Sequence, residues 1–288
     1  MTEAEKQYID LYTEASEAIK EHSAEVMNAV RDRAFEDFRR QGFPTRKVER
    51  YKYTDMEKIF APNYGLNINR IEFPVDPYAA FRCDVPNLST LLYFVVNDAF
   101  YEKRLPNVQP EEGVVIGSLK QAAEQHPELV EKYYSRLAKT DEDAVTALNT
   151  MLAQDGLFIY VPKNVQMEKC VQIINILRAA VSMMVNRRVL IVMEEGAKAK
   201  FLFCDHTADD HDFLATQVIE AYVGDNASLD LYCMEETHYK NHRVSNVYIE
   251  QQRDSRVNHN VITLHNGVTR NRLDLVFKGE GAECYCSG

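Results

Sequence analysis

The chain has 288 residues, of which 45% are apolar and 27% are charged, and its formal net charge is −11 at pH 7; these are values of a globular protein with one large domain or two ordinary ones. The negative charge argues against nucleic acid as the main partner, because phosphate contacts require a basic protein face. The apolar runs are far shorter than the roughly 18 residues of a membrane span, and the acidic start MTEAEKQYID lacks the apolar core of a signal peptide, so we expect a cytoplasmic protein with reduced thiols and no membrane segment.

Residues 2–41 are predicted to form a helix, because apolar residues recur there at three- and four-residue steps. Thr2 and Glu5 have the spacing of a capping box, and Gly42 followed by Pro44 marks the end. This helix could dock a partner or cover its own domain, and the second role is the simpler one.

Residues 44–60 place Tyr51 and Tyr53 among basic side chains, a mixture that can bind single-stranded nucleic acid. The acidic character of the whole chain favours a structural junction instead. Residues 61–90 are predicted to be a loop, because prolines fall at positions 62, 74, 77 and 86.

Strands and helices alternate in the next part of the chain. We predict buried strands at 91–98 and 113–119, a helix at 118–138 interrupted by Pro127, and a helix at 141–156 that ends at Gly156. The predicted organisation is therefore an N-terminal helical region (1–60), an α/β linker region (61–156) and a β core (157–288).

From Leu157 onward, short apolar runs follow one another with polar turns between them. Gly, Asn or Asp occupies most of the turns, because these residues tolerate a positive φ. Several runs alternate, as where Leu229 and Leu231 flank Asp230, which predicts one buried face. A sandwich, a barrel and a β-solenoid all give this pattern, and the scarcity of Asn-Gly and Asp-Gly hairpin signals favours the solenoid. The runs are 157–161, 171–177, 187–193, 198–204, 217–223, 227–233, 243–250, 257–264 and 272–277.

The sequence contains none of the common catalytic motifs. It has no GxxxxGK[ST] phosphate loop, no GxGxxG, GxSxG or HExxH, and no CxxC pair. We therefore assign no catalytic residue.

Three groups of residues are of metal-ligand type. Cys204 and His206 are followed by further Asp and His residues, although this segment also fits a solvated acidic turn after a strand. Cys284 and Cys286 would point the same way from one strand, either toward a ligand or as small core residues. The third group consists of His238, His242, His259 and His265. Stacked strands could bring His259 near others, but isolated polar positions on an outer face explain these histidines at least as well.

Three segments carry a family pattern. FRRQGFPTRKVERYKYTDMEKI (38–59) contains Gly-Phe-Pro and then Glu-x-aromatic-basic-Tyr-Thr; ALNTMLAQDGLFIYVPKNVQMEKCVQIINIL (147–177) contains Leu-Asn and then Val-Pro-Lys-Asn. RRVLIVMEEGAKAKFLF (187–203) has an Arg, five apolar residues and Glu-x-x-Ala. In this order they resemble the SufB/SufD family of the Suf iron–sulfur cluster assembly system, and the first segment favours its SufD branch.

The resemblance implies a mainly β fold with an α/β N-terminal region, in which helices precede a right-handed parallel β-helix. It implies a non-catalytic scaffold subunit of a SufBCD-type complex that supports iron acquisition and cluster transfer, with a SufB-like paralogue and a SufC-like ATPase as partners. The chain stops within its strand series, before the family's Cys-x-His segment and C-terminal helices. We therefore expect an incomplete β-helix, truncated at its C-terminus, that lacks the docking helices and holds no cofactor, although iron or an iron–sulfur cluster is possible in the full complex.

Two other functions remain open from the residues alone. A solenoid carbohydrate-active enzyme would need a carboxylate cluster on one face, which outward-facing Glu220, Asp230 and Asp274 could supply. A metal-binding protein would use Cys and His side chains, with Cys284, Cys286, Cys204 and His206 as candidates.

Overall fold

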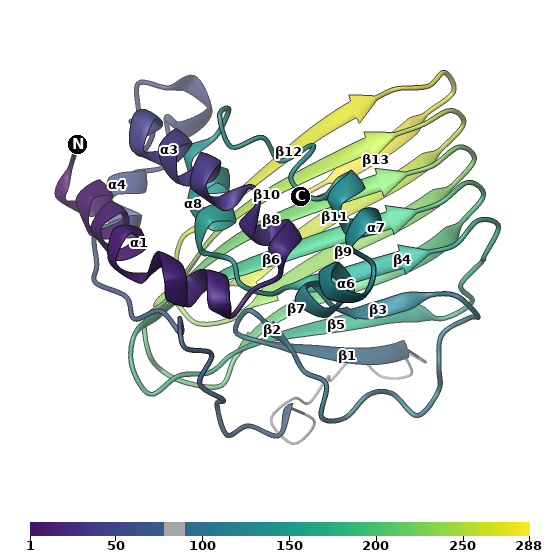
Figure 1. Ribbon diagram of the computed structural model, residues 1–288. Coiled ribbons are helices and arrows are strands. Elements are labelled where there is room, and N and C mark those ends of the chain that lie inside the picture. Colours follow the sequence, from purple (N-terminus) through teal and green to yellow (C-terminus); the bar gives the residue numbers. More distant parts are fainter. Residues whose placement is uncertain (78–89) are drawn as a thin grey trace.

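A computed structural model describes residues 1–77 and 90–288 (Figure 1). Its body is a parallel β-solenoid with two sheets, A and B, on opposite sides of an apolar interior. Sheet A contains β3 (Val115–Ser118), β4 (Leu157–Val161), β6 (Met183–Met193), β8 (Phe213–Val223), β10 (Asn241–Gln251) and β12 (Thr269–Phe277). Sheet B contains β1 (Thr90–Val96), β2 (Ala99–Phe100), β5 (Cys170–Leu177), β7 (Lys198–Thr207), β9 (Ser228–Glu236), β11 (Arg256–His265) and β13 (Glu283–Ser287).

From β4 onward the chain alternates between the two sheets, and each strand pairs in parallel with the next strand of the same sheet. The pairing of β4 with the preceding strand β3 is antiparallel. The predicted parallel β-solenoid is therefore confirmed. The register stacks like residues in columns, and one column in sheet A consists of Leu157, Val189, Ile219, Val247 and Leu273. These side chains point inward and form the interior core together with those of sheet B.

The turn from each sheet A strand to the next sheet B strand repeats one backbone conformation. A residue with positive φ stands at this corner in every coil: Asn164, Gly196, Asn226, Asp254 and Gly281. The corners are joined to one another, since the amide of Asn164 donates to the carbonyl of Glu195 (2.8 Å) and the amide of Gly196 to that of Asp225 (2.8 Å). The expectation of Gly, Asn and Asp in the turns is confirmed, because only these residues adopt such a corner without strain.

Helices cover the outer face of sheet A (Figure 1). They are α1 (Glu3–Glu21), α2 (Glu25–Asn28), α3 (Arg31–Gln41), α4 (Met56–Phe60), α6 (Leu119–Gln125), α7 (Pro127–Tyr133) and α8 (Ala144–Leu152), with the short 3-10 helix η1 (Glu49–Tyr51) between α3 and α4. The break between α6 and α7 before Pro127 was predicted, whereas α8 is shorter than predicted. No helix in the described ranges is long and apolar enough to cross a membrane.

The prediction of one helix over 2–41 is wrong, because the segment forms three helices, and the backbone is extended at Ala24 between α1 and α2. The capping box of Thr2 and Glu5 is present, and Gly42 closes α3 with a φ of 60°. Tyr8 and Phe38 pack with α8 and with Met184 of β6 in one buried cluster. The N-terminal helices therefore cover their own domain, as the simpler interpretation held.

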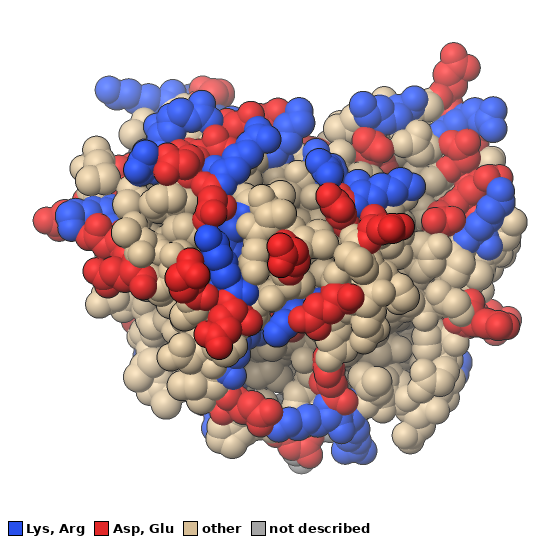
Figure 2. All heavy atoms as spheres, in the orientation of Figure 1, with Lys and Arg blue, Asp and Glu red and all other residues tan. Residues whose placement is uncertain are grey.

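The loop predicted at 61–90 is confirmed for residues 61–76, which contain no helix or strand, whereas β1 already begins at Thr90. Pro86 lies outside the described residues. Basic and acidic side chains are interspersed over the helical layer (Figure 2). The face shown thus offers no continuous basic surface for nucleic acid.

Replacing Leu231 with alanine is expected to lower the free energy of unfolding by about 2–5 kcal/mol, as for other buried leucines. Leu231 is fully buried in the interior core. Urea denaturation measures the loss, and Leu264→Ala is the control, because Leu264 is 60% exposed and should change the value by less than about 0.5 kcal/mol. Equal losses in the two variants would contradict the inward position of Leu231.

Gly156 allows the segment after α8 to approach β6 closely. A Cβ atom at Gly156 would lie 2.0 Å from the carbonyl oxygen of Arg188, whereas one at Gly117 in β3 would meet no atom within 4 Å. Gly156→Ala is therefore expected to destabilise the protein by about 1–3 kcal/mol or more through overpacking, and Gly117→Ala is expected not to. Thermal melting of both variants tests this, and similar melting temperatures would show that the backbone there relaxes freely.

Candidate functional site

The interior of the solenoid becomes polar where sheet B strands end and sheet A strands begin. Four charged side chains meet there, and each is at most 5% exposed: Arg187 of β6, Asp205 of β7, Glu235 of β9 and Arg243 of β10. We call these four residues the polar rim. They project inward because each is an even number of residues away from the inward-facing apolar residues of its own strand.

The polar rim is a continuous chain of ion pairs. Asp205 receives Nη1 of Arg187 at 2.5 Å and Nη1 of Arg243 at 2.7 Å, and Nε of Arg243 lies 3.1 Å from Glu235. Burial acts to raise the pKa of Asp205, but Arg187 and Arg243 outweigh it and hold the pKa below its ordinary value. For Glu235 burial dominates over Arg243, so that its pKa is raised.

A cavity of about 570 Å³ extends from the polar rim toward β12 and β13. Its wall includes Cys233, Arg243, His259, Thr263, Asn271 and Cys286. It is the place where buried polar groups and thiols come together, and we take it as the candidate site.

Cys284 and Cys286 both face the interior from β13, and their Sγ atoms are 3.3 Å apart. The predicted common direction of the two side chains is confirmed. Burial, and then the contact with Cys286, raises the pKa of the Cys284 thiol to about 12. Such a thiol is protonated at neutral pH and is a poor nucleophile.

His259 lies beside Cys286 in the parallel register of β11 and β13. Its Nδ1 is 3.2 Å from the carbonyl oxygen of Leu231. A carbonyl can only accept, so Nδ1 carries the hydrogen and Nε2 keeps a free lone pair in the neutral ring. Burial lowers the pKa of His259 and so favours this neutral form. Of the two interpretations of the four histidines, the outer-face position does not hold for His259, which is buried in the interior.

Cys204 and His206 are not brought together with Cys284 and Cys286. They lie within β7, which continues to Thr207, on the outer face of sheet B, where Cys204 packs beside Ile174. The expected strand end at Cys204 is thus wrong, and Cys204 has the surroundings of a core residue. Within residues 1–77 and 90–288, no three His, Cys, Asp or Glu side chains are already arranged to hold a metal ion.

The three carboxylates that could have served a carbohydrate-active enzyme do not form a cluster. Asp230 lies on the outer face of sheet B near Lys200 (3.9 Å), and Asp274 on the outer face of sheet A beside Arg272. Glu220 was expected to face solvent, but it is fully buried beneath the helices. The prediction failed because alternation shows which face a residue occupies and not whether that face is covered.

Glu220 joins sheet A to the segment after α7. Its carboxylate pairs with Arg188 at 2.6 Å and accepts hydrogen bonds from the amides of Ser135 (2.8 Å), Leu137 (3.0 Å) and Ala138 (3.0 Å). Both charged groups of the pair are 0% exposed. Every contact here is used for packing, which leaves no free carboxylate for acid–base chemistry.

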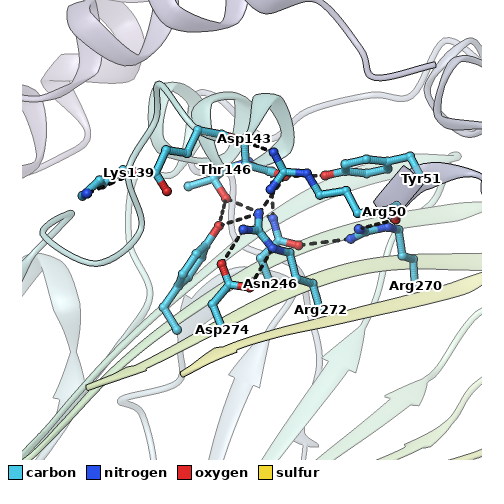
Figure 3. Close-up of polar contacts among 11 residues, drawn as sticks. Arg50, Tyr51, Lys139, Asp143, Thr146, Asn246, Arg270, Arg272 and Asp274 are labelled. Atoms are coloured by element: carbon cyan, nitrogen blue, oxygen red, sulfur yellow. Dashed lines mark hydrogen bonds and ion pairs between the residues drawn. The ribbon is translucent and has the colours of Figure 1, made fainter. Parts of the chain in front are cut away.

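A second polar cluster fixes the N-terminal region on β10 and β12 (Figure 3). Asp143 caps α8 by accepting from the amide of Thr146 (2.9 Å), and it also receives Tyr51, Asn246 (2.9 Å) and Arg272 (3.0 Å). Arg270 stacks on the ring of Tyr51 at 3.9 Å and donates to the carbonyl of Arg50 at 3.1 Å. We call Tyr51, Asp143, Asn246, Arg270 and Arg272 the Asp143 clasp.

Sequence reasoning placed Tyr51 at a structural junction, which the clasp confirms, but it missed Asp143 and Arg272. The N-cap position of Asp143 before an apolar helix was a usable signal. Arg270 and Arg272 alternate on β12, which marks one polar face of the strand. Nothing in the sequence indicated that these residues, far apart along the chain, meet.

Comparison with known proteins gives a consistent family match. Residues 2–173 match the family model described as SufBD protein N-terminal region, and residues 175–288 match SUF system FeS cluster assembly, SufBD core domain. The iron-sulfur cluster assembly protein SufD of Bacillus subtilis is 30% identical over 185 residues, which cover 64% of this chain and 41% of that protein. An iron-sulfur cluster assembly SufBD family protein of Arabidopsis thaliana is 30% identical over 141 residues, 47% of this chain and 30% of its own length. The match thus covers less than half the length of either relative.

The stability contributed by Asp205 should depend on pH. Because its pKa is lowered on folding, its contribution is fully present above the unfolded-state pKa of 3.8 and is lost as the pH falls through the lower folded-state value. Asp205→Asn is therefore expected to cost about 3–5 kcal/mol at neutral pH, where two arginines lose their partner, and about 1 kcal/mol less at pH ~3, which lies just below the unfolded-state value.

Urea denaturation of the natural sequence and the variant at both pH values gives the comparison. Asp210→Asn is the matched control, since the Asp210 side chain is 73% exposed and should change little at either pH. A cost for Asp205→Asn that is the same at both pH values would mean that its charge is not what stabilises the polar rim.

Proposed function

The chain belongs to the SufBD family of iron–sulfur cluster assembly proteins, and from this membership we propose that it is a non-catalytic scaffold subunit of a Suf-type assembly complex. The observation that carries the proposal is the family match, which runs through both the N-terminal region and the solenoid core. The Asp143 clasp supports it, because it holds these two parts together as one body on which partners can assemble.

The distribution of ionisable groups supports a role without catalysis. A general acid or base needs a group whose proton is available to a substrate. Glu220, Asp205 and Asp143 are instead enclosed by cationic side chains and backbone amides. Asp230 and Asp274, two of the carboxylates that a carbohydrate-active enzyme would use, lie on different sheets of this protein. No observation therefore favours that alternative.

The partners we propose are a SufB-like paralogue and a SufC-like ATPase, with iron acquisition and cluster transfer as the activity that the complex supports. The basis for these partners is similarity to a relative that is an iron-sulfur cluster assembly protein. We place the complex in the cytoplasm, since the cysteines of the described residues are all free thiols, as reducing compartments favour. Between residues 157 and 288 the structure has strands and turns but no helix, so helix-mediated docking of the ATPase would require a segment outside this range.

Affinity purification of the natural protein, tagged at its genomic locus, tests the proposal. We expect it to recover the SufB-like and SufC-like proteins of the same organism. Failure of the natural protein to recover either partner would refute the scaffold role.

A further inference from the structure

We propose that Cys284, Cys286 and His259 form a binding site for one divalent cation of the kind that thiolate and imidazole ligands prefer, such as Zn²⁺ or Fe²⁺. The three residues lie together on β11 and β13 at the edge of the interior cavity. The site goes beyond the scaffold role, which needs no metal bound by this chain, and it does not depend on the proposed partners.

The spacing of the two thiols fits a shared ion better than a disulfide. Tetrahedral coordination with metal–sulfur bonds of about 2.3 Å places two sulfurs about 3.8 Å apart, so the observed 3.3 Å needs a change of only about half an ångström. A disulfide needs sulfurs about 2.05 Å apart and Cα atoms no more than about 6.8 Å apart. Residues two apart on a strand have Cα atoms about 6.7 Å apart, which is at the limit for that bond.

His259 supplies the third donor from the neighbouring strand. It is buried in the cavity wall, and its hydrogen bond to the Leu231 carbonyl leaves the lone pair on Nε2. Histidines that bind metals are oriented in the same way by a carbonyl or carboxylate on the other nitrogen. Neighbouring strands are about 4.8 Å apart, so a thiol of Cys286 and the ring of its register partner can reach one ion.

The thiols are the ligands that must move. No three such side chains in the described ranges already surround one point, and the His259 ring is held by Leu231. Cys286 is exposed and Cys284 is half-buried on β13, so both can turn toward the ring. On binding, each thiol releases its proton to solvent and becomes a thiolate ligand, and water completes the four-coordinate shell.

Titration of the reduced 288-residue chain with Co²⁺ under anaerobic conditions tests the site, because cobalt reports thiolate ligands through a near-ultraviolet charge-transfer band. We expect one Co²⁺ per chain and this band in the natural sequence. Cys284→Ser and Cys286→Ser should each remove about half of the band or more and weaken Co²⁺ binding by at least about tenfold, as the loss of even a supporting residue does at such sites. Absence of the band in the natural sequence would overturn the proposal.

Two further variants decide which groups bind. Cys170→Ser is the matched control, since Cys170 is a half-buried free thiol on β5 and its loss should leave the band unchanged. Loss of the band in this control, or retention of the band in both β13 variants, would overturn the proposal.

His259→Gln should keep the charge-transfer band but change the visible cobalt spectrum and weaken binding. An unchanged spectrum and affinity would show that His259 is not a ligand. Far-ultraviolet circular dichroism and the urea midpoint verify that each variant is folded. If the chain binds no metal, its co-purification with the proposed partners is still expected.

Discussion

The in-register parallel pairing of strands is the constraint on which the rest of the structure depends. Each residue stacks on the equivalent residue of the next coil, so an inward or outward direction applies to a whole column of side chains. The same register sets the polar contacts. It places Glu220 one diagonal step from Arg188 on neighbouring strands β8 and β6, and it places His259 directly beside Cys286. A shift of one residue would exchange the side chains of the interior core with those of the outer face.

The outer face of sheet A explains why the N-terminal region is part of the domain. Charged groups on this face cost several kcal/mol each to bury unless they are paired and hydrogen-bonded. The covering segments supply the partners: backbone amides of residues 135–138 for Glu220, and Asp143 for Arg272. Buried pairs of this kind add little net stability, so most of the free energy that holds the layers together comes from the apolar contacts around them. The geometry of the pairs fixes one orientation of helices on sheet.

The elements of the fold could largely be predicted from the sequence, because strand alternation, helix caps and turn residues are local signals. The candidate site could be predicted only in part. The common direction of Cys284 and Cys286 follows from a spacing of two on a strand, whereas the position of His259 beside them depends on the register between β11 and β13. The burial of Glu220 depends on a layer of helices from an earlier part of the chain. Long-range packing of this kind has no signal in the local pattern.

The buried carboxylates of this fold differ from those of an active site in the partners that they have. An active site keeps a titratable group partly unsatisfied, so that a substrate completes its contacts. Asp205 has two arginines, Asp143 accepts from Tyr51, Thr146, Asn246 and Arg272, and Glu220 has one arginine and three amides. Within the described residues these carboxylates already have the partners that a substrate would otherwise supply. The thiols of β13 differ, because their main neighbours are each other and an imidazole whose Nε2 lone pair is not used by Leu231. Chemistry beyond assembly in this part of the chain is therefore to be sought at soft ligands rather than at carboxylates.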